Sequence, residues 1–183
     1  YVGVARTMAH FTGDTLDTAT PSLDGSDMAR LLDAVDGETS CVVVQYPDIL
    51  GRVEDLAPLA AKCQTQGVLL VAVVTEPVAL GLLKSPGEMG ADIVVGEAQS
   101  LGVGLQFGGP YVGLFATRNK YVRQMPGRLC GETVDAEGKR GFVLTLDNPE
   151  LGLLQTEWAE NRAKLPTDAI RNTLGRLFDA LYP

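Results

Sequence analysis

Residues 41–74 decide the fold class, and they read CVVVQYPDILGRVEDLAPLAAKCQTQGVLLVAVV. The segment 41–46 is short, continuous and rich in valine, which is typical of a strand buried on both faces. Residues 54–66 place apolar side chains at helical spacing, and Gly67 follows as a helix cap. Residues 68–74 form a second continuous apolar run. Strand, helix and strand at this spacing predict a βαβ unit with parallel strands and a right-handed crossover.

The rest of the chain continues this alternation of strands and helices, which predicts an α/β fold. Residues 92–96 and 111–116 read as further strands, and residues 133–146 read as a β-hairpin around a loop at 135–138. Weaker patterns predict a strand at 15–20, short helices at 78–84 and 118–124, and longer helices at 2–11, 26–35, 153–161 and 168–181.

Composition narrows the class of protein. The 183 residues are 45% hydrophobic and carry a formal net charge of −8. Such an apolar fraction supports a packed core and excludes a disordered chain. The acidic excess argues against broad binding to nucleic acid or to anionic membranes. No apolar run reaches the ~18–20 residues of a membrane helix, and no signal peptide is visible. Because the first methionine is Met8, inside an amphipathic segment, we expect a processed or truncated chain.

Several common chemistries are excluded by the residues themselves. With His10 as the only histidine and no CxxC pair among three cysteines, no zinc-type metal site can be built. Cys41 and Cys63 lie in apolar patterns and are expected to be buried thiols in a reducing compartment. The chain has no GxxxxGK[ST] loop, and Gly102 and Gly104 lack the third glycine and the helix of a dinucleotide site.

Polar side chains follow two neighbouring predicted strands, at the edge where ligands bind in open α/β sheets. They belong to Thr75, Glu76, Glu97, Gln99 and Ser100. None of these is a lysine, and no lysine of the chain occupies a strand end or pocket suited to a Schiff base. The glycine-rich segment 101–110 has two readings, a tight connection between strands or a loop bordering a cofactor or substrate pocket.

Basic side chains follow the strand at 111–116. Arg118, Lys120 and Arg123 are expected to form a solvated face of a short helix. Arg128, in the next loop, has two readings: it meets a carboxylate or phosphate through a bidentate contact, or it anchors the loop through an ion pair.

At this point several ordered motifs resemble one known family. Its motifs match GADIVVGEAQSLG at 90–102, FGGPYVG at 107–113, MPGR at 125–128, GETVDAEGKRGF at 131–142 and PVALGLL at 77–83. Together they resemble the P-protein family of the glycine cleavage system, glycine dehydrogenase (decarboxylating), and most of all the α chain, subunit 1, of its two-subunit form. The resemblance covers residues 1–146, whereas residues 147–183 depart from the family pattern.

The resemblance implies a fold, a partner and the absence of a bound cofactor. The fold is part of a fold type I pyridoxal-phosphate transferase-like large domain, three-layer α/β/α with a mostly parallel sheet. Residues 1–146 belong to it, and residues 147–183 form a divergent helical tail that packs on it. In this family the β chain carries the cofactor lysine, and Ser100 stands at that position here. Thr75 stands near the position of the superfamily's pyridine-binding aspartate. The resemblance therefore implies no catalytic residue and no bound cofactor in this chain, with pyridoxal phosphate held by the β subunit.

The implied function is an α-subunit-type component of glycine decarboxylase, an oxidoreductase of glycine catabolism. It would complete the active site of the β subunit in a cytoplasmic heterotetramer, which decarboxylates glycine and transfers the aminomethyl group to lipoyl H-protein. The residues expected along the channel are Thr75, Glu97, Gln99, Phe107, Gly108, Gly109, Pro110 and Arg128. One alternative is a truncated, catalytically inactive paralogue or fragment that acts only as a scaffold or interaction domain. Another is an independent pyridoxal-phosphate enzyme that uses a different lysine.

Overall fold

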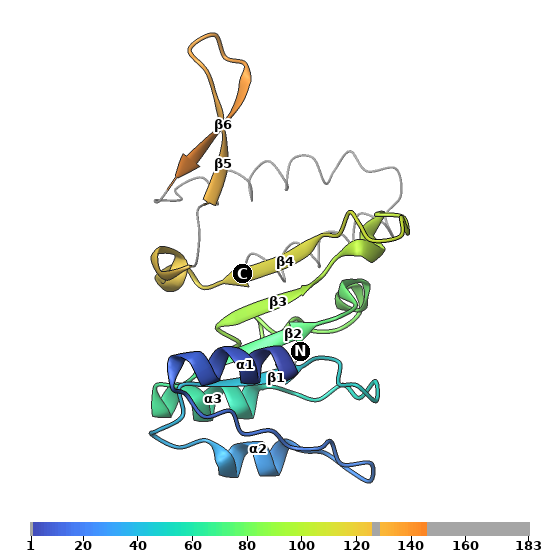
Figure 1. The fold of residues 1–183 in the computed structure, drawn as a ribbon, viewed down its shortest axis with the longest axis vertical. Coiled ribbons are helices and arrows are strands. Elements are labelled where there is room, and N and C mark those ends of the chain that lie inside the picture. Colours follow the sequence, from blue (N-terminus) through green and yellow to red (C-terminus); the bar gives the residue numbers. More distant parts are fainter. Residues whose placement is uncertain (1, 126–128, 146–183) are drawn as a thin grey trace. The chain divides into compact units, whose positions relative to one another are not determined.

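The structure is a computed structural model that describes residues 2–125 and 129–145. The chain divides into two compact units, with the boundary between Ala34 and Val35. Figure 1 traces the described elements of both units along the sequence. The tail expected at 147–183 lies outside the described residues.

The first unit contains two helices, α1 (Val2–Thr12) and α2 (Met28–Ala34). Ser26 caps α2 as predicted, because its Oγ accepts a hydrogen bond from the Met28 amide at 3.0 Å. The strand predicted at 15–20 is wrong, since the structure has no strand there. The segment between the helices is held instead by side chains, for example Arg30, whose guanidinium donates to the carbonyl oxygen of Thr20 at 3.1 Å.

The second unit is built on a four-stranded sheet in the spatial order β1-β2-β3-β4. Its strands are β1 (Cys41–Gln45), β2 (Leu69–Val74), β3 (Ile93–Glu97) and β4 (Gly113–Thr117). The first three are parallel, and β4 returns antiparallel to β3 along one edge of the sheet. The predicted α/β fold with a mostly parallel sheet is therefore confirmed (Figure 1).

The predicted βαβ unit is formed by β1, helix α3 (Ala57–Gln66) and β2. The helix starts three residues later than predicted, at a first turn that contains Pro58, where a missing amide is tolerated. It ends at Gly67, whose φ of 72° and amide contacts to Cys63 and Gln64 carbonyls make the predicted cap. Leu59 and Cys63 on this helix and Leu70 on β2 are fully buried. The core of the unit thus lies between α3 and the sheet.

Three short 3₁₀ helices and a hairpin complete the described elements. They are η1 (Pro77–Gly81), η2 (Gln99–Leu101), η3 (Asn119–Gln124) and the antiparallel pair β5 (Leu129–Val134) and β6 (Arg140–Thr145). In the hairpin turn, the Asp135 carboxylate accepts hydrogen bonds from the amides of Glu137 and Lys139. The predicted hairpin is confirmed, with its first strand starting earlier than expected. Among the described residues, none of the helices combines the length and apolar character needed to span a bilayer.

The prediction that β1 is buried on both faces is wrong. Val43 on β1 keeps 56% of its surface exposed, and Cys41 at its start is exposed as well. A continuous apolar run records how hydrophobic a strand is but not whether both of its faces are covered. In this unit β1 is an edge strand, paired only with β2 among the described residues.

Thiol labelling of the native chain should therefore modify Cys41 and Cys130 rapidly and Cys63 only on unfolding. Cys41 and Cys130 are exposed, whereas Cys63 is fully buried, and burial raises the pKa of its thiol. Counting reacted thiols with a chromogenic disulfide reagent, before and after addition of denaturant, checks this. Rapid native labelling of Cys63, located by peptide mapping, would contradict the packing of α3 on the sheet.

Candidate functional site

The parallel order of β2 and β3 brings two chain segments together at the carboxyl edge of the sheet. Thr75 and Glu76 follow the end of β2, and residues 98–101 follow the end of β3. The 3₁₀ helices η1 and η2 that begin there contact each other. This is the edge at which open α/β sheets bind ligands.

A side-chain hydrogen bond joins the two segments. The Ser100 hydroxyl donates to Oε1 of Glu76 at 2.8 Å, although the two residues lie 24 positions apart. The same Glu76 oxygen accepts from the Val78 amide at 3.1 Å and so caps the start of η1. Glu76 therefore accepts two hydrogen bonds through one oxygen, and this arrangement holds Ser100 against η1.

Glu97 makes a second carboxylate cap, at the start of η2. Its Oε1 accepts from the amides of Ala98 at 3.0 Å and of Gln99 at 2.8 Å. Ala98, which is fully buried, also donates its amide to the Val112 carbonyl at 2.8 Å. The amides at the start of η2 are thus bonded to groups of the protein itself. The Ala98–Val112 hydrogen bond also connects the residues before β4 to the end of β3.

Strand β3 passes close to β2 at Gly96. A Cβ atom built at this position would lie 2.5 Å from the backbone oxygen of Val74. Only glycine allows β3 to pass β2 at this distance. The close approach sets the positions of the segments that leave both strands.

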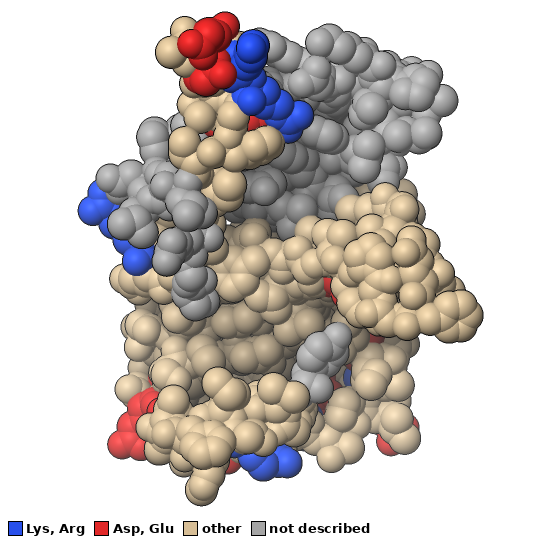
Figure 2. Space-filling model, turned by 45° about the horizontal axis from the view of Figure 1, so that its top comes forward, with Lys and Arg blue, Asp and Glu red and all other residues tan. Residues whose placement is uncertain are grey.

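The loop at 102–112 projects from this edge and carries apolar side chains into solvent. Leu105 and Phe107 are almost completely exposed, and Tyr111 is exposed as well. Phe107, Gly108 and Gly109 all have positive φ angles, so the backbone turns sharply at three successive residues. Figure 2 shows an almost entirely uncharged surface in this part of the molecule, at the right of the view.

The structure places the predicted site residues as follows. Thr75, Glu97, Gln99 and Ser100 lie at the carboxyl edge, and the loop containing Phe107, Gly108, Gly109 and Pro110 starts from the same edge. Arg128 lies outside the described residues. A channel-lining role for these residues stays a prediction.

One charged cluster was not found by sequence reasoning. Asp92 lies directly before β3, and its Oδ1 is 3.6 Å from Arg118 Nε and 3.7 Å from Lys120 Nζ. The predicted solvated helix face is therefore wrong for Arg118, which precedes η3 and is ion-paired. Only the antiparallel return of β4 brings these residues together, and the local sequence pattern carries no signal of it.

Comparison with known proteins gives concordant results. A family model described as "Glycine cleavage system P-protein" matches residues 3–153. The chain is 74% identical to "Probable glycine dehydrogenase (decarboxylating) subunit 1" of Sphingopyxis alaskensis over 151 residues, which cover 82% of this chain and 33% of that protein. It is 72% identical to the protein of the same name from Novosphingobium aromaticivorans, with the same two coverages. The chain thus spans about a third of the length of these curated relatives.

A solved structure is similar as well. It is described as a crystal structure of glycine decarboxylase (P-protein) of the glycine cleavage system in inhibitor-bound form. The TM-score is 0.63 at 41% sequence identity, and the match covers 98% of this chain and 39% of that one.

Proposed function

Since this chain belongs to the glycine cleavage system P-protein family, we propose that it is an α-type component of glycine decarboxylase that completes the active site of a second subunit. The second subunit holds the cofactor, decarboxylates glycine and passes the aminomethyl group to lipoyl H-protein. The contribution of this chain is structural: it presents the loop at 102–112 and the carboxyl edge to its partner. A reducing compartment such as the cytoplasm suits its three free cysteines.

The observation that carries the proposal is the chemistry of the carboxyl edge. The P-protein family uses pyridoxal phosphate, which needs a lysine for covalent attachment and donors for its phosphate. At this edge the position after β3 holds Ser100, bonded to Glu76, and the Glu97 carboxylate occupies the amides of Ala98 and Gln99. These groups do not fit a resident pyridoxal phosphate, because position 100 lacks the lysine and the amide donors of Ala98 and Gln99 are already bonded to a carboxylate.

The exposed apolar loop supports association with a partner. Leu105, Phe107 and Tyr111 are exposed on one loop, and the segment 101–117 contains no charged residue. Exposed apolar groups of this kind mark interaction surfaces, and aromatic side chains are enriched among the residues that dominate binding energy. The loop directly follows η2, which contains Ser100, so a subunit that covers the loop also meets the carboxyl edge.

Ser100→Lys should not convert the chain into a cofactor-binding protein. The Glu76 carboxylate lies 2.8 Å from the Ser100 hydroxyl, so it would pair with the introduced ammonium group and keep it protonated. Incubation with pyridoxal phosphate followed by borohydride should leave position 100 unmodified in the wild-type chain and in the variant, as read by peptide mass spectrometry. The double variant Glu76→Gln/Ser100→Lys controls for the pairing. A stoichiometric adduct at position 100 of the single variant would contradict the prediction.

Association with subunit 2 tests the proposed function directly. The chain, co-purified with the cognate subunit 2, should elute with it on size exclusion at micromolar concentration. Phe107→Ala should weaken the complex by about tenfold, because a truncated central aromatic anchor costs 1–2 kcal/mol or more. Phe11→Ala is the matched control, since Phe11 is also highly exposed but lies on α1 in the other unit. No complex with the wild-type chain would overturn the proposal, and equal effects of the two variants would remove the assigned role of the loop.

A further inference from the structure

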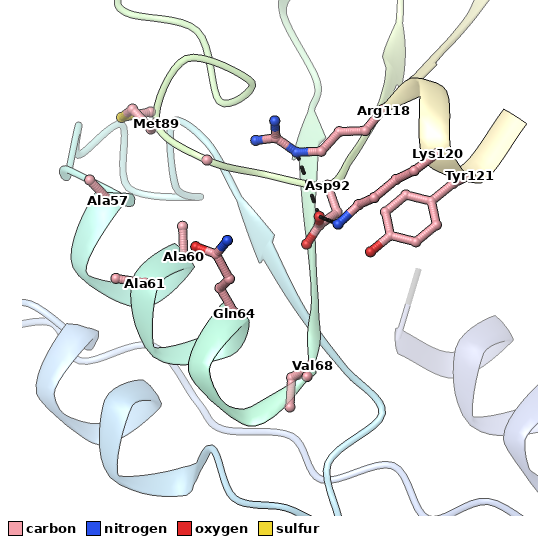
Figure 3. Close-up of a pocket in the computed structure, with 12 residues that line it drawn as sticks. Ala57, Ala60, Ala61, Gln64, Val68, Met89, Asp92, Arg118, Lys120 and Tyr121 are labelled. Atoms are coloured by element: carbon pink, nitrogen blue, oxygen red, sulfur yellow. Dashed lines mark ion pairs between the residues drawn. The ribbon is translucent and has the colours of Figure 1, made fainter.

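A pocket opens at the opposite edge of the sheet, beside the amino ends of β2 and β3. It has a volume of ≈ 590 Å³, within the range of small-molecule sites. Helix α3 forms one side, and Asp92 and the segment from Arg118 to Tyr121 form the other. Figure 3 shows these side chains gathered around the pocket. The site lies across the sheet from Ser100 and does not rest on the function proposed above.

The pocket is lined by more positive than negative side chains. Among the described residues that line the pocket, Asp92 is the one carboxylate, and its Oδ1 faces both Arg118 and Lys120 at 3.6 and 3.7 Å. Its other oxygen accepts from the Leu70 amide at 3.1 Å, so the carboxylate is fixed to the sheet. Two cations thus share one anion, and the pocket carries an excess of one positive charge in a chain with a net charge of −8. Contact with Tyr121 raises the pKa of Lys120, which keeps that excess charge in place.

Two side chains of the pocket have hydrogen-bond donors without an acceptor among the described residues. Arg118 contacts Asp92 through Nε, and within the described part of the chain no group accepts from its two terminal nitrogens. The side-chain amide of Gln64 likewise has no partner there. Figure 3 shows the Arg118 guanidinium and the Gln64 amide reaching into the same space from opposite sides. A planar guanidinium with two free nitrogens matches the two oxygens of a carboxylate.

The remaining lining is apolar. Ala57, Ala60 and Ala61 present one face of α3, and Met89 closes the end of the pocket. Ala60 is buried against Gly90, where an added Cβ would lie 2.7 Å from the Ala60 Cβ, so Ala57 and Ala61 form the accessible part of this face. The polar and apolar parts are thus segregated, as in sites that orient an amphipathic ligand.

We propose that this pocket binds a small monocarboxylate, with its carboxylate held by Arg118, Lys120 and Gln64 and its apolar body against the alanine face of α3. The single excess positive charge matches a monoanion. A phosphate dianion would exceed that charge.

Benzoate is a suitable probe, because it joins one carboxylate to one apolar ring. Titration of the ¹⁵N-labelled 183-residue chain, followed by NMR, should shift the signals of residues lining the pocket along one saturable curve, with a Kd of about 1 mM for a ligand of this size. Arg118→Gln should weaken the affinity by about tenfold through loss of a bidentate contact. Lys120→Gln should weaken it by about threefold, since this ammonium is largely exposed.

Matched variants separate a site from general charge attraction. Lys84→Gln makes the same substitution as Lys120→Gln at an exposed lysine outside the pocket, and it should leave the affinity unchanged. Gln64→Glu adds a negative charge at an exposed lining position and removes none of the charged side chains, so it should abolish binding even if Arg118→Gln proves unstable. Non-saturable shifts, equal effects of the two lysine variants, or tighter binding of inorganic phosphate than of benzoate would each overturn the proposal.

Discussion

Leu70→Ala should lower the free energy of unfolding of the chain by about 2–5 kcal/mol, the range observed when a fully buried leucine is truncated. Leu70 is 0% exposed and lies on β2, which pairs with β1 on one side and β3 on the other. Truncation removes apolar contacts in the middle of the sheet, where the backbone is held by both neighbours and cannot collapse into the cavity. Urea unfolding followed by circular dichroism measures the change as a lower midpoint at a similar slope.

The matched control for this variant is Leu82→Ala. Leu82 directly follows η1 and keeps 86% of its surface exposed, so its truncation should change the free energy of unfolding by less than about 0.5 kcal/mol. A loss of comparable size in both variants would mean that Leu70 does not lie in the core that the structure assigns to it.

Gly96→Ala should destabilise the chain by about 1–3 kcal/mol and disturb the candidate site. The new methyl group would lie 2.5 Å from the Val74 oxygen, which is a backbone atom and cannot rotate away. The strands β2 and β3 must therefore separate at their carboxyl ends, where Ser100 and Glu76 are joined. Unfolding in urea gives the energy, and amide hydrogen exchange at Ala98 reports the local loosening.

Gly113→Ala provides the comparison on the neighbouring strand. Gly113 pairs with Glu97, and a methyl group there would meet no atom of residues 2–125 or 129–145 within 4 Å. Its effect should lie within about 0.5 kcal/mol of zero. If both glycine variants behave alike, the close approach of β3 to β2 is not a constraint on the fold.

Much of the fold could be predicted from local patterns. The βαβ unit at 41–74 and the cap at Gly67 are each decided by residues near one another in the chain, and the structure contains both. The boundaries of the four strands in the main sheet differ from the predicted ones by one or two residues, whereas β5 of the hairpin starts four residues earlier than predicted. The covering of β1 was predicted wrongly, because hydrophobicity of a strand does not say what packs on each face.

The candidate site was predictable in composition but not in geometry. Ser100 and its polar neighbours could be assigned to the carboxyl edge, since parallel strands end on the same side of a sheet. The hydrogen bond between Ser100 and Glu76 could not be predicted, because it depends on the distance between β2 and β3 at Gly96. The role of Glu97 as a cap for η2 could not be predicted either. This cap occupies the amides of Ala98 and Gln99, which are then not available to a ligand.

The sequence by itself determined the α/β class, the order of the strands from β1 to β6 and the family, because periodicity, caps and motifs are properties of contiguous residues. Only the tertiary structure decided the direction of β4, and with it the meeting of Asp92 with Arg118 and Lys120. A strand of five residues has the same apolar pattern whichever way it runs. Its direction is fixed by hydrogen bonding to β3 and by the loop that reverses the chain, and these are contacts between segments distant in sequence.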